Sequence, residues 1–282
     1  GCLVSRMKAA LVQLCASDDP AVNLPQTVDY IAQAAGRGAG FVLTPEVTNC
    51  VSQDRAHQTQ VLQHEADDIT LKGLCEAAIR NGIWLSIGSL ALKTDDPDGR
   101  FANRSFLIDP AGQIVARYDK IHMFDVAVSK TEIYRESAGY RPGTRAVVAD
   151  TPFAKIGLSV CYDVRFSYLY RALAQAGAEV LLIPSAFSPV TGAAHWEALL
   201  RARAIETGSY VLAAAQTGTH KSQAGKRRQT HGHSMAISPW GEVMADLGTD
   251  PGITLVDLDP ASVAQSRKRI AALSHDRPFE GP

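Results

Sequence analysis

Lys155-Ile-Gly-Leu-Ser-Val-Cys-Tyr-Asp-Val-Arg-Phe166 joins a predicted strand to a predicted helix through a cysteine. Residues 156–160 have the apolar, β-branched character of a buried strand, and Cys161 follows at its end. A cysteine at such a junction lies beside backbone N–H groups that the new helix leaves unpaired, and these groups can bind an anion or activate a thiol. A buried structural cysteine fits the same stretch equally well, so partners elsewhere in the chain must distinguish the two.

The composition is that of a soluble globular protein with a large core. Hydrophobic residues make up 46% and charged residues 20% of the 282 residues, and the formal net charge is −1. This charge argues against nucleic-acid and membrane-surface partners, because both favour a basic excess. No apolar run approaches the roughly 20 residues that span a bilayer.

Cysteine usage and the N-terminus indicate where the protein works and where its domain begins. The five cysteines are odd in number, far apart and without C-x-x-C spacing, which indicates a reducing compartment and predicts a cytoplasmic protein. The residues before Met7 lack the apolar stretch of a signal peptide. We therefore expect residues 1–6 to be an expression remnant and residues 7–278 to form one domain.

The two halves of the chain repeat the same order of predicted elements. Three pairs of segments match: residues 8–11 with 155–158, 38–45 with 177–184, and 105–112 with 234–241. Each half runs strand, helix, strand, strand, hairpin. This repeat predicts an α/β fold in which two similar mixed sheets pack face to face with helices outside, a four-layer α-β-β-α sandwich.

Helical spacing and long loops complete the expected organisation. Helices are predicted over four ranges: residues 23–36, 65–80, 167–176 and 194–207. Residues 121–145 show little periodicity, and a loop of this length inside a compact domain is typical of a functional segment. Residues 218–230 form a second polar loop, and no element is predicted after residue 257.

Three side chains of complementary chemistry follow predicted strands. Glu46 and Cys161 each follow a parallel strand, and Lys120 follows the first hairpin. In an open α/β sheet, ligands gather beyond the carboxyl ends of the strands. A nucleophilic thiol needs a base to take its proton and a cation or N–H donors to stabilise the oxyanion that forms after attack. Glu46 and Lys120 supply the base and the cation.

A papain-like Cys–His pair is the competing interpretation. The chain has eight histidines, and four of them are candidate partners: His122, His195, His231 and His233. The segment around Cys161 has no Cys-Gly-Ser-Cys-Trp string, and peptidases of that kind have another chain order. We therefore favour a site built from glutamate, lysine and cysteine, and we interpret His195 as structural.

Five segments together resemble the nitrilase superfamily of carbon–nitrogen hydrolases. They are Thr44-Pro-Glu46, Tyr118-Asp-Lys-Ile-His-Met-Phe-Asp125, Gly157-Leu-Ser-Val-Cys-Tyr-Asp-Val-Arg-Phe166, Gly232-His-Ser234 and Pro239-Trp-Gly241. The resemblance extends from Met7 to about Pro278. It implies the α-β-β-α sandwich, a catalytic triad at Glu46, Lys120 and Cys161, and hydrolysis of amides or nitriles without a cofactor or a metal.

The resemblance also implies a mechanism and an auxiliary carboxylate. Glu46 would take the proton of Cys161, and a thioester would form and then be hydrolysed by water. Lys120 and the backbone N–H of Tyr162 would stabilise the oxyanion. A further family glutamate falls on Glu136, with Glu132 as the competing candidate.

Three further segments look like the amidase branch of the family: residues 184–187, 191–197 and 200–206. This branch comprises deaminated-glutathione amidase and ω-amidase, and residues 213–220 look closer to the former. The implied reaction converts the terminal amide of a small anionic substrate, deaminated glutathione, to acid and ammonia. The alternatives are an ω-amidase of α-ketoglutaramate or α-ketosuccinamate, and a non-catalytic binding protein on the same fold.

Four candidate substrate-binding residues follow strands of the second half: Tyr162 through its backbone N–H, Arg165, Phe187 and Thr191. Arg165 follows Cys161 by four residues, and its planar guanidinium suits a substrate carboxylate, although an ion pair with Asp163 is the alternative. Phe187 and Thr191 follow the strand equivalent to the one before Glu46 and should face the mouth of the site, although Phe187 fits the core as well.

Two surfaces remain after these assignments. A basic cluster in the second polar loop contains Lys221, Lys226, Arg227 and Arg228. This cluster is either a solvent-exposed loop or, if it lies near the mouth of the active site, a positive patch that attracts a long anionic substrate. The helix predicted over residues 194–207 packs on its own sheet, and the resemblance adds a symmetric homodimer, or a higher homo-oligomer, through this region.

Overall fold

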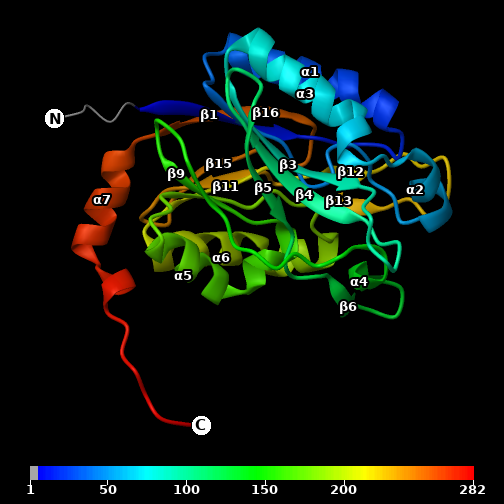
Figure 1. Cartoon of the computed structure of the whole chain (residues 1–282). Coiled ribbons are helices and arrows are strands. Elements are labelled where there is room, and N and C mark those ends of the chain that lie inside the picture. The colour runs from blue at the N-terminus through cyan, green and yellow to red at the C-terminus, as the bar shows by residue number, and fades with distance from the viewer. Residues whose placement is uncertain (1–5) are drawn as a thin grey trace.

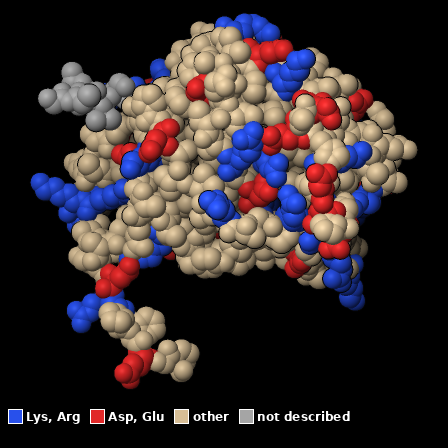
Figure 2. All heavy atoms as spheres, viewed as in Figure 1, with Lys and Arg blue, Asp and Glu red and all other residues tan. Residues whose placement is uncertain are grey.

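The computed structural model describes residues 6–282. The expected expression remnant therefore lies outside the described residues except for Arg6. Within residues 6–282, no helix has the length and apolar character needed to cross a membrane. Lysines and arginines are interspersed with acidic residues over the face drawn in Figure 2, in keeping with the net charge of −1.

The first sheet has six strands in the order β16-β1-β2-β3-β4-β5. Strands β1, β2 and β3 are parallel, and β4, β5 and β16 run antiparallel to their neighbours. Their bounds are β1 Met7–Gln13, β2 Phe41–Leu43, β3 Trp84–Leu92, β4 Ala102–Ile108, β5 Ile114–Asp119 and β16 Gly252–Leu258. Helices α1 (Pro20–Gly36) and α3 (Ile69–Asn81) pack against each other on one side of it (Figure 1).

The second sheet repeats this plan in the order β15-β14-β11-β10-β9-β8. Strands β9, β10 and β11 are parallel, and β8, β14 and β15 are antiparallel to their neighbours. Their bounds are β8 Val148–Asp150, β9 Lys155–Leu158, β10 Val180–Leu182, β11 Tyr210–Ala213, β14 Met235–Ile237 and β15 Val243–Asp246. Helices α5 (Ser167–Gln175) and α6 (Pro189–Thr207) cover its outer face. The predicted repeat and the α-β-β-α sandwich are confirmed.

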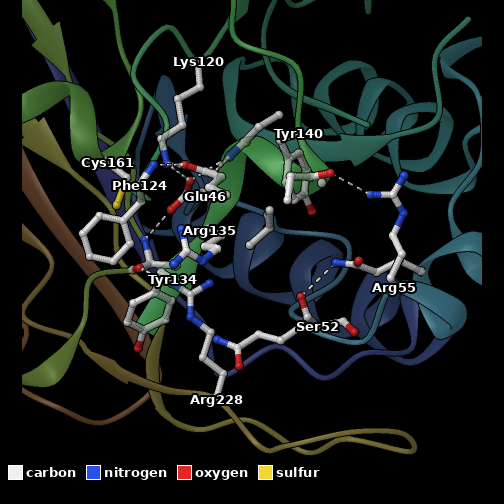
Figure 3. Close-up of a pocket in the computed structure, with 18 of the residues that line it drawn as sticks. Glu46, Ser52, Arg55, Lys120, Phe124, Tyr134, Arg135, Tyr140, Cys161 and Arg228 are labelled. Carbon is white, nitrogen blue, oxygen red and sulfur yellow. Dashed lines mark hydrogen bonds and ion pairs between the residues drawn. The ribbon is translucent and has the colours of Figure 1, made fainter. Parts of the chain in front are cut away.

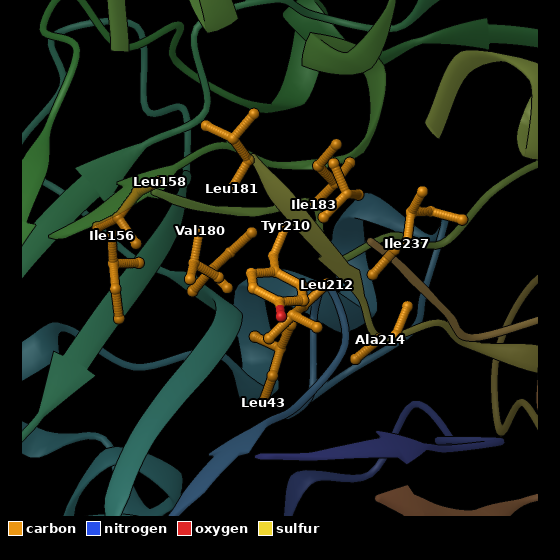
Figure 4. Close-up of a cluster of buried hydrophobic side chains, with 14 of the residues drawn as sticks. Leu43, Ile156, Leu158, Val180, Leu181, Ile183, Tyr210, Leu212, Ala214 and Ile237 are labelled. Atoms are coloured by element: carbon orange, nitrogen blue, oxygen red, sulfur yellow. The ribbon is translucent and has the colours of Figure 1, made fainter. Parts of the chain in front are cut away.

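Alternation along the strands assigns one face of each strand to the interface between the sheets. In β1 and β2, Leu11 and Leu43 belong to the core cluster shared with the second sheet, whereas Val12 and Val42 pack toward α1 and α3. Figure 4 shows Leu43 of the first sheet in one buried cluster with side chains of the second, among them Tyr210 and Leu212. The core is therefore continuous across the sandwich.

Several elements differ from the prediction at their ends. Helix α6 begins at Pro189 rather than residue 194, and the helix predicted over 65–80 is divided into a short 3₁₀ turn and α3, because Asp68 caps the latter. The unpredicted helix α7 spans Pro260–Arg269. Small elements not yet named are α2 Arg55–Val61, β6 Asp125–Ala127, β7 Ile133–Arg135, α4 Glu136–Gly139, β12 Thr217–Thr219 and β13 Gln229–His231. Both long loops therefore contain hairpins.

Candidate active site

Glu46, Lys120, Glu136 and Cys161 meet in a cavity of about 520 Å³. Glu46 lies beyond β2, Lys120 follows β5, Glu136 begins α4, and Cys161 lies beyond β9. Because β2 and β9 are parallel strands of the two facing sheets, the residues beyond their carboxyl ends can meet at one end of the sandwich. Figure 3 shows the Cys161 sulfur beside the Lys120 and Glu46 side chains.

Lys120 links the two glutamates. Its Nζ lies 3.0 Å from Glu46 Oε2 and 2.8 Å from Glu136 Oε1, and its side chain is only 2% exposed. Asn103 Nδ2 donates a second hydrogen bond to Glu46 Oε2 at 2.8 Å. The buried ammonium therefore has two carboxylate partners, which is the condition under which a buried charge remains ionised.

These contacts keep Glu46 and Lys120 charged. Burial by itself would raise the pKa of Glu46, but the charges of Lys120 and Arg228 and the hydrogen bonds from Lys120 and Asn103 hold it below its ordinary value. Burial opposes the charge on Lys120 as well, yet Glu136 and Glu46 raise its pKa well above the ordinary value. Glu46 is therefore an ionised carboxylate at neutral pH.

The backbone around Glu46 is held by the second half of the chain. The Ala186 N–H donates to Glu46 Oε1 at 3.0 Å, and Gln216 Nε2 donates to the Glu46 carbonyl oxygen at 3.0 Å. Val47 has φ of 48°, a region that β-branched residues rarely adopt. Hydrogen bonds from the opposite sheet thus fix both the carboxylate and the strained turn after it.

Cys161 lies at the tight turn that follows β9, where it is the first residue of the 3₁₀ segment Cys161–Arg165. Its φ is 48°, its N–H donates to the Pro184 carbonyl at 2.9 Å, and it is 7% exposed. Burial, together with the Glu46 charge and against that of Lys120, raises the pKa of the thiol to about 12. The sulfur is therefore protonated at neutral pH and must lose its proton to a base before or during attack.

The carboxylate of Asp163 holds this turn in place. It accepts hydrogen bonds from the Val160 N–H at 2.9 Å, from the Tyr118 hydroxyl at 2.5 Å and from the His122 N–H at 3.1 Å. The His122 ring also contacts Asp163, through Nδ1 at 2.7 Å. Asp163 is thus committed to the turn, and the alternative ion pair between Arg165 and Asp163 is not formed among the described residues.

Glu136, not Glu132, contacts the lysine. In addition to its ion pair with Lys120, Glu136 Oε1 accepts a hydrogen bond from the Phe124 N–H at 2.7 Å. Glu132 instead accepts a hydrogen bond from the Ser188 hydroxyl at 2.8 Å. The geometry therefore separates the two candidates that the sequence left open.

No histidine of the described chain lines the cavity. His122 pairs with Asp163, and His195 Nδ1 lies 3.1 Å from Arg165 Nη2. The Cys–His pair of a papain-like site is therefore not formed. Within residues 6–282, no group of three His, Cys, Asp or Glu side chains has an arrangement that could hold a metal ion.

The side chains of the four predicted substrate-binding residues do not line this cavity. Arg165 lies over the Phe187 ring at 5.7 Å, and Phe187 is buried against Trp196 with ring centroids 4.9 Å apart. Tyr162 packs between Phe124 and Phe166, and the Thr191 hydroxyl faces the Ser188 carbonyl in the first turn of α6. The core alternative for Phe187 is the one that the structure favours.

Three arginines that the sequence did not assign to the site line it instead: Arg55, Arg135 and Arg228. The sequence does point to Arg228, because it belongs to the basic cluster of the second polar loop. One of the two interpretations of that cluster places it near the mouth of the site. Arg55 and Arg135 gave no signal, since neither lies near a recognisable motif. Asn103 was also missed, although it precedes Lys120 in the hairpin and pairs with Glu46.

Comparison with known proteins agrees with this geometry. The family model for carbon-nitrogen hydrolase matches residues 8–268. A Dictyostelium discoideum protein named deaminated glutathione amidase is 45% identical over 284 residues, covering 98% of this chain and 96% of that protein. The C. elegans NitFhit structure has a TM-score of 0.89 at 35% identity, covering 97% of this chain and 66% of that one.

A second solved structure extends the comparison. Saccharomyces cerevisiae Nit3, described as a member of branch 10 of the nitrilase superfamily, has a TM-score of 0.82 at 27% identity and covers 97% of both chains. Since the family model and these relatives match nearly the whole chain, the resemblance drawn from the sequence motifs is confirmed. The chain belongs to the carbon–nitrogen hydrolase family, within the nitrilase superfamily.

Proposed function

We propose that this chain is an amidase of deaminated glutathione that works through a thioester on Cys161. The observation that carries the proposal is the cavity in which an ionised Glu46, paired with Lys120, adjoins the buried Cys161 thiol. The name of the Dictyostelium relative supports the choice of substrate. Glu46, Lys120 and Cys161 form the catalytic triad, and Glu136 keeps Lys120 charged and oriented.

Acylation begins with removal of the thiol proton. Because the pKa of Cys161 is about 12, a resting thiolate is not available, and Glu46 takes the proton as sulfur attacks the amide carbonyl carbon. The negative charge that forms on the carbonyl oxygen is stabilised by the Lys120 ammonium and the Tyr162 N–H. The carbon–nitrogen bond then breaks, the departing amine takes the proton from Glu46, and the acyl group remains as a thioester.

Deacylation reverses these roles. Glu46 takes a proton from water as the hydroxide oxygen attacks the thioester carbonyl, and Lys120 again stabilises the oxyanion. The carbon–sulfur bond breaks, and the proton returns from Glu46 to sulfur. The products are a carboxylic acid and a free thiol, so the cycle closes without a redox change.

The identity of the leaving group distinguishes the candidate substrates. In deaminated glutathione the reacting amide is secondary, so the leaving group is the amine of cysteinylglycine. Ammonia, which the sequence motifs led us to expect, leaves only from primary amides such as α-ketoglutaramate. The cavity of about 520 Å³ favours the larger substrate, because it lies within the range that holds ligands of drug size.

The test is hydrolysis by the purified protein with α-ketoglutarate release as the readout. We expect turnover of deaminated glutathione with a higher kcat/KM than that of α-ketoglutaramate, and no detectable turnover by Cys161→Ala. A higher kcat/KM for α-ketoglutaramate would make the protein an ω-amidase. Turnover of neither amide would favour a non-catalytic binding protein, and activity in Cys161→Ala would refute the thioester.

We further propose one domain over residues 7–278, a homodimer or higher homo-oligomer, and a cytoplasmic location. Val190 and Ile205 of α6 are about half exposed, which supports burial of this helix against a copy of itself. The four described cysteines are free thiols, as expected in a reducing compartment. Light scattering on the purified protein tests the assembly, for which a monomer at all concentrations is the contrary result.

A further inference from the structure

The cavity beside Cys161 has an excess of positive charge. Four basic side chains line it, Lys120, Arg55, Arg135 and Arg228, against the two acidic side chains of Glu46 and Glu136. Both glutamates form ion pairs with Lys120, so neither forms one with an arginine of the cavity. No ion pair among residues 6–282 includes any of the three. We call Arg55, Arg135 and Arg228 the arginine wall.

Arg228 is anchored but not neutralised. Its Nη2 donates to the Ala186 carbonyl at 2.6 Å, and its guanidinium lies 5.9 Å from the centre of the Tyr134 ring. Its Nε is buried and has no hydrogen-bond partner. A buried donor without a partner is rare in folded proteins, and one on a charged group is costlier still. Arg228 lines the cavity, and this donor is the part of its guanidinium that no group of the described chain satisfies.

Orphaned polar atoms concentrate at this cavity. Three buried side-chain atoms of the described chain have no hydrogen-bond partner, and two of them, Arg228 Nε and Asn103 Oδ1, belong to residues that line it. One is a charged donor and the other a neutral acceptor. Together they match a ligand that has both an anionic group and an N–H, as an amide with a carboxylate has.

Arg55 extends the wall away from the thiol. Its Nη1 and Nη2 donate to the backbone carbonyls of Ala138 and Gly99, and its guanidinium lies 4.6 Å from the centre of the Phe101 ring. Figure 3 shows Arg55 on the side of the cavity away from Cys161, with Arg228 reaching toward Glu46. A substrate with its amide at Cys161 and a carboxylate several bonds away can therefore contact the wall.

We propose that the arginine wall binds a carboxylate on the amine side of the substrate, with Arg228 as its main contact and the specificity-determining residue. This inference rests on the proposed amidase function and adds a chemical class to it: amides whose leaving amine carries a carboxylate. A primary amide has no group on its leaving side and would leave the wall unpartnered. A guanidinium with a free Nε–H suits a carboxylate, which accepts paired hydrogen bonds.

The test compares three substrates that share one acyl group. They are deaminated glutathione, its analogue with a C-terminal glycinamide in place of the glycine carboxylate, and α-ketoglutaramate. We expect Arg228→Gln to lower kcat/KM for deaminated glutathione by about ten- to a hundredfold, the value of a charged hydrogen bond. The other two substrates should lose only what the Arg228 charge contributes through Glu46, an effect common to all three, since the wall has no carboxylate to bind in them.

Arg227→Gln is the matched control, because the substitution removes the same charge. Arg227 is the exposed neighbour of Arg228 and does not line the cavity. The Arg227→Gln variant should leave all three values unchanged. Arg228→Lys should lie between wild type and Arg228→Gln, since it keeps the charge but not the paired donors. Equal losses of Arg228→Gln on all three substrates would overturn the proposal, because Arg228 would then act through the charge of Glu46.

Binding to the inactive variant separates failure of this inference from failure of the proposed function. Calorimetry on Cys161→Ala should give a Kd for deaminated glutathione about ten- to a hundredfold lower than for the glycinamide analogue. Adding Arg228→Gln should abolish that difference. Equal affinities would overturn the role of the wall even if the wild-type enzyme hydrolyses deaminated glutathione. Absence of hydrolysis with unequal affinities would refute the proposed reaction and keep the carboxylate site.

Discussion

Burial acts in opposite directions on the two reacting groups at the residue scale. For Cys161 it is the largest influence and keeps the thiol protonated, with a pKa of about 12. For Glu46 the Lys120 and Arg228 charges overcome it, so that the pKa is lowered and the carboxylate remains ionised. The site therefore holds an ionised carboxylate beside a protonated thiol. General-base catalysis needs this arrangement, because the carboxylate can accept the proton as the sulfur attacks.

The pH profile follows from these two groups. The acid limb of kcat/KM should lie below 4.5, the ordinary pKa of a glutamate, because Glu46 must be ionised to act as a base. The alkaline limb should lie above 10.5, because the pKa of Lys120 is raised above that value. We expect a flat profile between these limits, measured with samples that regain full activity at pH 7. A limb near 6.5 would indicate a histidine and contradict the triad.

The positions of site residues could be predicted only for residues that directly follow a predicted strand or hairpin. Glu46 and Cys161 each end a strand of the repeat, so their meeting follows from the fold, and Lys120 follows from its hairpin. Arg55, at the start of α2, and Arg228, in the loop between β12 and β13, reach the cavity from segments far apart in sequence, and no periodicity marks such contacts. Arg165 lies in the family-like motif, yet its guanidinium stacks over Phe187 outside the cavity.

Element ends show where local signals outweigh periodicity. Asp68 is the N-cap of α3 and accepts a hydrogen bond from the Leu71 N–H at 2.8 Å, so the helix begins there although the periodic pattern extends to residue 65. Helix α7 escaped prediction because it buries only Val263 and Ser266 and so lacks an apolar stripe. Pro189 starts α6 a full turn before its apolar spacing begins.

The α3 cap makes a prediction about stability. Burial raises the pKa of Asp68 from 3.8 to about 6 in the folded state. The folded state therefore binds more protons than the unfolded state in this window, so the Asp68 contribution to the free energy of unfolding falls as pH rises from 3.8 to 6, by at most about 3 kcal/mol. Asp68→Asn keeps a capping oxygen without this titration.

Urea unfolding of both proteins across this pH range measures the difference. The stability of wild type relative to Asp68→Asn should decrease toward pH 6 and then remain constant. Asp68→Ala, which has no capping oxygen, should be less stable than Asp68→Asn at every pH by roughly 0.5–2 kcal/mol. A difference between wild type and Asp68→Asn that is independent of pH would contradict the raised pKa.

The whole molecule is two copies of one plan that meet at the candidate site. The matched segments of the sequence end at Pro45 and Pro184, which follow the equivalent strands β2 and β10. This repeat made the four layers predictable, because each half supplies the sheet that covers the other. The spacing between the sheets was not predictable. It depends on side-chain contacts between segments that are far apart in the sequence, and no sequence pattern indicates which of them meet.

Gly88 of β3 packs against the strand end that precedes Glu46 and against Pro184 of the second half. A Cβ added there would lie 2.0 Å from the Thr44 carbonyl oxygen, 2.5 Å from the Pro45 carbonyl oxygen and 2.5 Å from Pro184 Cβ. Two of these atoms are backbone, and Pro184 is rigid, so none can move aside without shifting a strand end. Because Thr44 and Pro45 lead directly into Glu46, any such shift would reach the base.

Gly88→Ala should therefore lower both stability and kcat. Overpacking of this kind costs typically about 1–3 kcal/mol, and each kcal/mol lowers Tm by roughly 2–4 °C in a protein of this size. Gly36→Ala is the control, because Gly36 ends α1 with no atom within 4 Å of an added Cβ. It should leave kcat and Tm unchanged or raise Tm slightly. If the two variants behave alike in calorimetry and turnover, the close packing at Gly88 does not determine the position of Glu46.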